Sequence, residues 1–262
     1  MNKLLFSLII LLPHTLIHAQ DNYEIQVYGA ETIAPHYTML ELHSNYTFSG
    51  TTQKINGVVP TNHVLHETVE ITQGFSDWFE AGFYLFTAIG SSHRTGFVGS
   101  HIRPRIALPQ RMHFPVGLSL SAEVGFQKRD YSEDDWSLEI RPIIDKNLGR
   151  FYLSFNPTFD KSLHGLNQKE GFSFAPNFKA ALSISKWIIP GIEYYGALGQ
   201  LNHVSPYQEQ QHALFLTLDT ELSADWEFNI GYGFGLTPAT DHSIIKLIAG
   251  RRIHDQAKRE KR

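Results

Sequence analysis

The stretch Trp136–Asp160, WSLEIRPIIDKNLGRFYLSFNPTFD, contains two alternating runs of apolar and polar residues. Every second residue is apolar from Trp136 to Ile144, and again from Phe151 to Phe159. Successive side chains of a β-strand point to opposite faces, so this period of two predicts a hairpin whose strands are apolar on one face and polar on the other. The turn is expected at Lys146, Asn147, Leu148 and Gly149.

The same alternation recurs along the chain, and no helix is needed beyond the first residues. About twelve strands are expected, at 38–49, 62–72, 78–88, 98–107, 114–126, 136–145, 151–160, 172–185, 188–198, 212–222, 228–236 and 242–253. Strands of roughly ten residues cross a bilayer at the usual tilt. The pattern therefore predicts an all-β protein with a transmembrane antiparallel up-and-down β-barrel over 37–253.

The connections between these strands alternate in length. Short ones are expected near Gly74, His113, Asn147, Lys186 and Ala224, and mostly longer ones near Gly57, Ser92, Tyr131, Gly165, Ser205 and Thr240. Tight turns at one end and longer loops at the other are typical of outer-membrane barrels, whose ends meet the periplasm and the exterior.

Composition fits this class. Aromatic residues make up 13% of the chain and charged residues 18%, and after the first residues no run of ~20 apolar residues could form a membrane helix. The formal net charge of −4 gives no reason to expect nucleic acid as a partner. The absence of cysteine excludes a disulfide framework.

The N-terminus has the pattern of a secretory signal peptide. Lys3 precedes an apolar run over 4–12, and Ala19 offers a small residue for cleavage. We therefore expect a signal peptide over 1–19, a periplasmic lead-in over 20–36 and, after the barrel, a basic C-terminal tail over 254–262. A short membrane anchor is the alternative for the first segment.

Tryptophan and proline positions give two further expectations. Trp78, Trp187 and Trp226 adjoin short turns and Trp136 begins a strand at the opposite rim, as in the aromatic girdles of membrane barrels. The alternative is that they cap a soluble core. Prolines remove a ladder hydrogen bond, so bulges or kinks are expected where they interrupt strands. These are Pro104, Pro142, Pro157, Pro176 and Pro190.

The segments GFSDWFEAGFYL, EIRPIIDKNLGRFYLSFNPTFDKSL and WEFNIGYGFGLTP resemble bacterial outer-membrane β-barrels of the phenol-degradation (meta-pathway) or transporter-like group. The resemblance extends over most of the chain and is carried by strand and turn patterns. It implies location in the outer membrane and a barrel architecture. The chain departs from the usual barrel ending, because nine residues follow Ile253 where a terminal aromatic residue would mark the last strand.

If the apolar parity faces lipid, the other parity lines the lumen. It collects Glu41, His43, Glu67, His101, Arg103, Arg105, Glu123, Glu139, Arg141, Asp145, Asp160, Lys179, Glu193, Asp219, Glu221, Glu227 and Lys246. The candidate lumen-lining residues are Arg103, Arg105, Glu123, Glu139, Arg141, Lys179 and Glu193. Their charges could form a transverse field that selects solutes, or an ion network that fills and rigidifies a narrow interior.

No motif predicts catalysis. The 14 histidines are scattered, and we expect no catalytic residue, no cofactor and no metal. The expected function is an outer-membrane channel or uptake pore for small molecules, hydrophobic ones included. The alternatives are an outer-membrane lipid hydrolase and a structural or adhesive barrel. The expected partners are outer-membrane lipid, a small solute of unknown identity and the barrel-assembly machinery.

Overall fold

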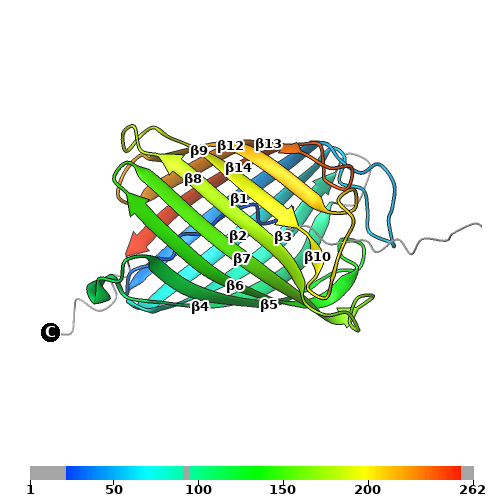
Figure 1. The fold of residues 1–262 in the computed structure, drawn as a ribbon, viewed down its shortest axis with the longest axis horizontal. Coiled ribbons are helices and arrows are strands. Elements are labelled where there is room, and N and C mark those ends of the chain that lie inside the picture. Colours follow the sequence, from blue (N-terminus) through cyan, green and yellow to red (C-terminus); the bar gives the residue numbers. More distant parts are fainter. Residues whose placement is uncertain (1–21, 91–94, 255–262) are drawn as a thin grey trace, which may run out of the picture.

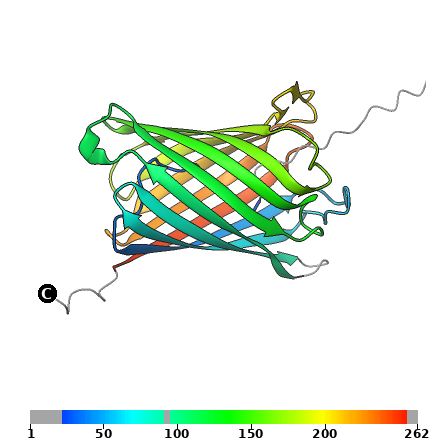
Figure 2. The same ribbon diagram turned by 90° about the horizontal axis from the view of Figure 1, so that it is seen from below.

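The computed structural model describes residues 22–90 and 95–254. Within these ranges, twelve antiparallel strands, tilted relative to the barrel axis, close into a barrel (Figures 1 and 2). They are β1 (Tyr37–Ser49), β2 (Val64–Ser76), β3 (Phe79–Gly90), β4 (Gly96–Ala107), β5 (Gly117–Gln127), β6 (Asp134–Leu148), β7 (Phe151–Gly165), β8 (Ser173–Leu182), β9 (Ile189–Ala197), β12 (Gln211–Glu221), β13 (Trp226–Gly235) and β14 (Ser243–His254). Each strand pairs with the next in this order, and β1 pairs with β14 to complete the ring.

Two smaller elements lie at the ends of the barrel. β10 (Gly199–Gln200) and β11 (His203–Val204) form a short hairpin that extends the edge of β8. The 3₁₀ helix η1 (Gln110–Met112) lies in the connection between β4 and β5. No helix in the described part of the chain is long and apolar enough to cross a membrane.

The turn of the β6–β7 hairpin is tighter than expected. Pairing continues to Leu148 and Phe151, so only Gly149 and Arg150 connect the strands. Gly149 has φ 65°, a left-handed conformation that costs glycine nothing because it has no Cβ atom. The observed turn is therefore 149–150, whereas the expected turn covered 146–149.

Side chains alternate around the wall as the period of two predicts. On β1, Leu40 and Leu42 are 41% and 44% exposed on the outside, whereas His43 is fully buried inside. Every barrel strand carries apolar side chains on its outer face, and together they form a continuous belt. An apolar surface of this extent on a monomer suits lipid rather than water. All four tryptophans have exposed side chains.

The five prolines interrupt the ladders without shifting the register. Pro142 pairs with β5, but the β6–β7 ladder has no bridge between Ile140 and Ile144. The same register places Pro142 opposite Pro157, which pairs with Pro176 on β8. Register shifts occur elsewhere, near strand ends, so the expected bulges are not found at the prolines. The missing N–H groups instead leave gaps in the pairing.

The other two prolines lie beside comparable gaps. Pro104 pairs with β3, and the β4–β5 ladder is interrupted between Ile102 and Arg105. Pro190 pairs with β12, whereas pairing between β8 and β9 ends at Gly191. Each proline thus keeps one neighbouring strand in register and loses bridges to the other.

Residues 22–36 lie inside the barrel, which corrects their expected position as a periplasmic lead-in. The side chain of Asn22 donates a hydrogen bond to Asp241 at the long-loop end, and the N–H of His36 donates to the carbonyl of Gly74 at the short-turn end. The segment therefore traverses the lumen. We call residues 22–36 the lumen segment. The predicted signal peptide over 1–19 lies outside the described residues, as does all of the predicted tail beyond His254.

Apolar residues of the lumen segment pack on the few apolar residues of the inner wall. Tyr23 contacts Phe86, Val27 belongs to a cluster with Phe215, and Tyr28 to one with Ile143. The segment has no sequence period because the wall around it supplies both its apolar contacts and its hydrogen-bond partners. The core of this protein is thus the lumen segment together with the inner wall.

Candidate functional site in the barrel lumen

Tyr28 is buried in the lumen and anchors the lumen segment. Its N–H donates to the side-chain carbonyl of Asn156 over 2.7 Å, and its carbonyl accepts from Ser154 and Asn156 on β7. Its ring lies 4.7 Å from the guanidinium of Arg103 and 4.9 Å from that of Arg141. The aromatic face is attracted to both cations, so β4 and β6, which lie two strands apart on one side of the barrel, hold this ring.

A first ion cluster lies on β1 to β4. Nη2 of Arg103 is 2.6 Å from Oε1 of Glu70, and Nη2 of Arg105 is 2.8 Å from Oε1 of Glu80. Arg105 also donates to the carbonyl oxygens of Gly29 and Glu31 in the lumen segment. These arginines therefore join the wall to the segment.

A second ion cluster lies on β4 to β6 and includes the lumen segment. Arg141 is 3.0 Å from Glu24 and 2.7 Å from Glu139. Nδ1 of His101 is 2.5 Å from Oε1 of Glu123. A Cβ atom at Gly125 would lie 1.9 Å from the His101 ring, so glycine is required there for this contact.

A third ion cluster lies on β8, β9, β12 and β14. Lys179 is 3.0 Å from Glu193 and 2.8 Å from Asp219. Lys246 pairs with Glu193 and donates over 3.0 Å to the carbonyl oxygen of Ile25. Charged side chains that contact the segment thus come from β4, β6 and β14, through one ion pair and several hydrogen bonds to its carbonyl oxygens.

All seven candidate lumen-lining residues belong to these three clusters: Arg103, Arg105, Glu123, Glu139, Arg141, Lys179 and Glu193. Sequence analysis missed Glu24, Glu70 and Glu80. Glu70 and Glu80 occupy strands whose period is weak, and Glu24 belongs to a segment without a period. Glu67 was assigned to the wrong face, because it accepts a hydrogen bond from Ser44 on the outer parity.

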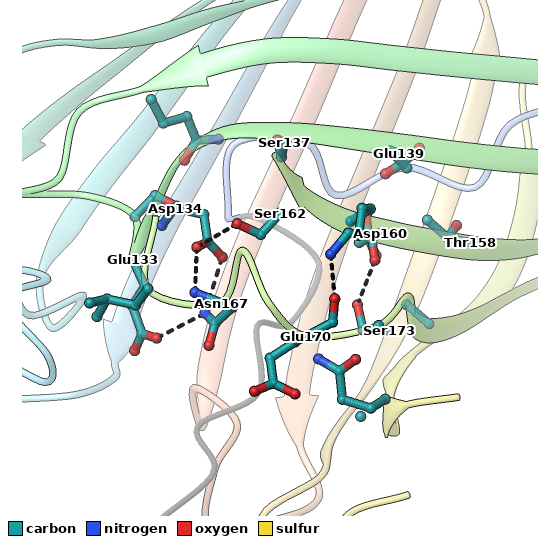
Figure 3. Close-up of a pocket in the computed structure, with 18 of the residues that line it drawn as sticks. Glu133, Asp134, Ser137, Glu139, Thr158, Asp160, Ser162, Asn167, Glu170 and Ser173 are labelled. Atoms are coloured by element: carbon teal, nitrogen blue, oxygen red, sulfur yellow. Dashed lines mark hydrogen bonds between the residues drawn. The ribbon is translucent and has the colours of Figure 1, made fainter. Parts of the chain in front are cut away.

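A cavity of about 540 Å³ occupies the long-loop half of the lumen. Its wall is formed by the inner faces of β3 to β8, and the lumen segment contributes Glu24. The loops at 131–134 and 166–171 and the β10–β11 hairpin line its outer end. Figure 3 shows Glu139 and Thr158 deeper in this cavity and Glu133, Asp134 and Asn167 at its rim. We call it the vestibule.

Carboxylates dominate the lining of the vestibule. They come from Glu24, Glu123, Glu133, Asp134, Glu139, Asp160 and Glu170, against one arginine, Arg141, and one lysine, Lys161. The rim is held by hydrogen bonds from Asn167 to Glu133 and Asp134 and from Ser162 to Asp134 (Figure 3). Deeper in the cavity, Oε2 of Glu123 and Oδ1 of Asn177 are buried and accept no hydrogen bond from the described residues.

Comparison with solved structures identifies the fold as that of porin-like barrels. The chain is similar to the COG4313 outer membrane channel from Pseudomonas putida F1, with a TM-score of 0.57 and 12% identity over 88% of this chain and 100% of that one. It is also similar to the NanC porin, with a TM-score of 0.55 and 10% identity over 80% and 97% of the two chains. The KdgM porin gives a TM-score of 0.54 and 8% identity over 82% and 99%.

No family model matches the sequence, and no curated protein matches it either. The similarity to solved structures therefore defines a class of protein by its fold, a closed twelve-stranded porin-like barrel. The predicted resemblance to the phenol-degradation or transporter-like group stays a prediction.

Proposed function

We propose that this protein is an outer-membrane channel for small solutes whose vestibule favours cations. The observation that carries this proposal is the vestibule, a cavity of about 540 Å³ whose lining has seven carboxylates and two permanently cationic side chains. Acidic linings select cations in channels because fixed negative charges raise the local concentration of the opposite charge. Low-dielectric barrel walls strengthen this effect.

The second support is the fold. The solved structures with the same barrel are named as a channel and two porins, and the apolar belt suits a membrane. The proposed location is the bacterial outer membrane, reached through a cleaved signal peptide and the barrel-assembly machinery. The long-loop end, with the vestibule, would face the exterior.

The lumen segment makes the proposed conduction path narrow. It crosses the lumen between the ion clusters, and its Glu24 carboxylate forms part of the vestibule lining. A solute that enters the vestibule therefore meets the segment before it reaches the short-turn end. Small hydrated cations and small organic cations are the solutes that this geometry supports best; the vestibule lining gives no particular support to the hydrophobic molecules expected from sequence.

Planar-bilayer recording tests the proposal. Purified protein in a bilayer with a KCl gradient should give single-channel steps and a reversal potential of the sign for K⁺ selectivity. Double substitution Glu133→Gln and Glu170→Gln should shift the reversal potential toward zero, because it removes two rim charges while the paired carboxylates deeper in the lumen stay in place.

The matched control is Asp77→Asn, which removes one carboxylate at the opposite end of the barrel, where Asp77 pairs with the exposed Arg111. It should leave the reversal potential unchanged. Anion selectivity of the wild-type channel would contradict the cation preference. Absence of conductance from barrels that migrate as folded on unheated gels would contradict the channel itself.

A further inference from the structure

Glu41, His43 and Glu70 bring three ligand-type atoms together on the inner wall of the first hairpin. Glu41 and His43 are two residues apart on β1, so both point into the lumen, and Glu70 faces Glu41 across the β1–β2 ladder. One donor atom from each residue lies within 4.8 Å of the other two. None of the three residues lines the vestibule, and no step of the proposed channel function uses them.

The polar atoms of this group are buried and poorly satisfied. His43 is fully buried, and neither ring nitrogen makes a hydrogen bond with any described residue. Nε2 of His43 lies 3.3 Å from Oε2 of Glu70, but this oxygen also lacks a hydrogen bond of acceptable geometry. Glu41 is only 6% exposed. Buried polar atoms are normally satisfied, so three neighbouring exceptions point to a bound species.

The charged side chains around the group include more acids than bases. The facing acids are Glu41, Glu70 and Glu80, and the facing bases are Arg103 and Arg105. Nearby Glu227 is already paired with Arg252. One of the three acids therefore has no basic partner of its own, and a buried carboxyl group is costly in its ionised form unless it is paired or binds a metal.

The donor set is that of a divalent transition metal. Imidazole nitrogen and carboxylate oxygens bind Zn²⁺ at ~2.0–2.2 Å, and a water commonly completes the tetrahedron. Three atoms within 4.8 Å of one another can reach those distances by movements of less than about 1 Å. Arg103 contacts Oε1 of Glu70 and leaves Oε2 for the metal, an arrangement that orients a ligating carboxylate.

We propose that Glu41, His43 and Glu70 form a zinc-type metal site that joins β1 to β2 inside the barrel. The sequence contains no metal motif because the ligands come from two strands and are brought together by their register. The bound ion would supply the missing positive charge and stabilise the hairpin next to the β1–β14 closure.

Calorimetric titration with ZnCl₂ tests this site. Full-length mature barrel without a histidine tag, stripped with EDTA and kept in detergent, should bind one Zn²⁺ per molecule. His43→Ala and Glu41→Gln should each weaken binding by more than about 100-fold, a larger loss than is typical for a residue that merely supports a ligand. Zn²⁺ should also raise the unfolding temperature of the wild type and of no ligand variant.

His66→Ala is the matched control, since His66 is another buried histidine on the inner face of β2. It should bind Zn²⁺ as the wild type does. Each variant is first shown to be folded by its migration on unheated gels, and His43→Gln replaces His43→Ala if the latter does not fold. Folded wild-type barrel that binds no Zn²⁺ would overturn the proposal, as would stoichiometric binding that survives both substitutions.

Discussion

Which charged residues face each other in the lumen depends on the register of the strands. Glu123 and Glu139 lie directly opposite each other on β5 and β6, a placement that is unfavourable for like charges. Arg141 contacts Glu139, and His101 contacts Glu123, so each carboxylate has a basic partner. The two acids are tolerated because Arg141, two residues along the same strand β6, and His101, on β4 beside β5, supply these partners.

Arg141 illustrates the cost of removing such a partner. Substitution Arg141→Met would leave Glu24 and Glu139 without their shared cation, and breaking a buried ion pair typically costs about 3 kcal/mol or more. We expect a clear fall in the urea midpoint of unfolding, measured in lipid vesicles by gel migration.

Arg129→Met is the control for this substitution. Arg129 is 59% exposed and pairs with Asp135 near the surface, so its loss should cost about 0–1 kcal/mol. Equal effects of the two substitutions would show that the cluster around Arg141 does not contribute as a buried network.

Among the elements, the lumen segment is the one that narrows the proposed conduction path. It is held by hydrogen bonds from β2, β4, β7 and β14 and by ion pairs, yet it belongs to no sheet. The wall does not depend on it for strand pairing. It can therefore be shortened without removing any ladder hydrogen bond.

Deletion of residues 22–33 should raise the single-channel conductance several-fold, because it removes the element that crosses the lumen. Bilayer recording of the folded deletion variant checks this expectation. Tyr28→Phe serves as a control: it keeps the ring between Arg103 and Arg141 and loses only the hydroxyl, so its conductance should stay close to that of the wild type. An unchanged conductance in the deletion variant would mean that ions bypass the segment.

At the scale of the whole molecule, the belt of outward apolar side chains determines the solvent that the barrel requires. Leu216 is 55% exposed in the middle of β12, whereas Leu222 is 50% exposed beside the turn that follows this strand. In a bilayer the first position would face hydrocarbon and the second the interface.

Leu216→Arg should therefore lower the unfolding free energy in lipid vesicles by about 2–4 kcal/mol, and Leu222→Arg by about 0–1 kcal/mol. Denaturant titrations of both variants measure the difference. If both substitutions were equally mild, the belt would not face hydrocarbon at this depth.

The sequence determined the wall of this barrel. Strands such as β1 and β5 alternate so regularly that one face had to be apolar, and a slip of one residue would have moved every side chain to the wrong face. The strand number, most of the turn lengths and the inward parity of the seven candidate lumen residues followed from this local period. The connection near His113 was expected to be short, but it spans 108–116 and contains η1. Glu70 and Glu80 were not predicted to line the lumen, because their strands mix apolar and polar residues on one parity.

The interior was decided only by the tertiary structure. The lumen segment has no period to read, and its position depends on partners from strands up to 221 residues away in sequence, such as Lys246. The pairing of Arg141 with Glu24, the vestibule and the cluster at Glu41, His43 and Glu70 depend on register and barrel closure as well. Local alternation specifies which face of the strand a side chain occupies, but only the register and closure of the barrel determine which residues it contacts.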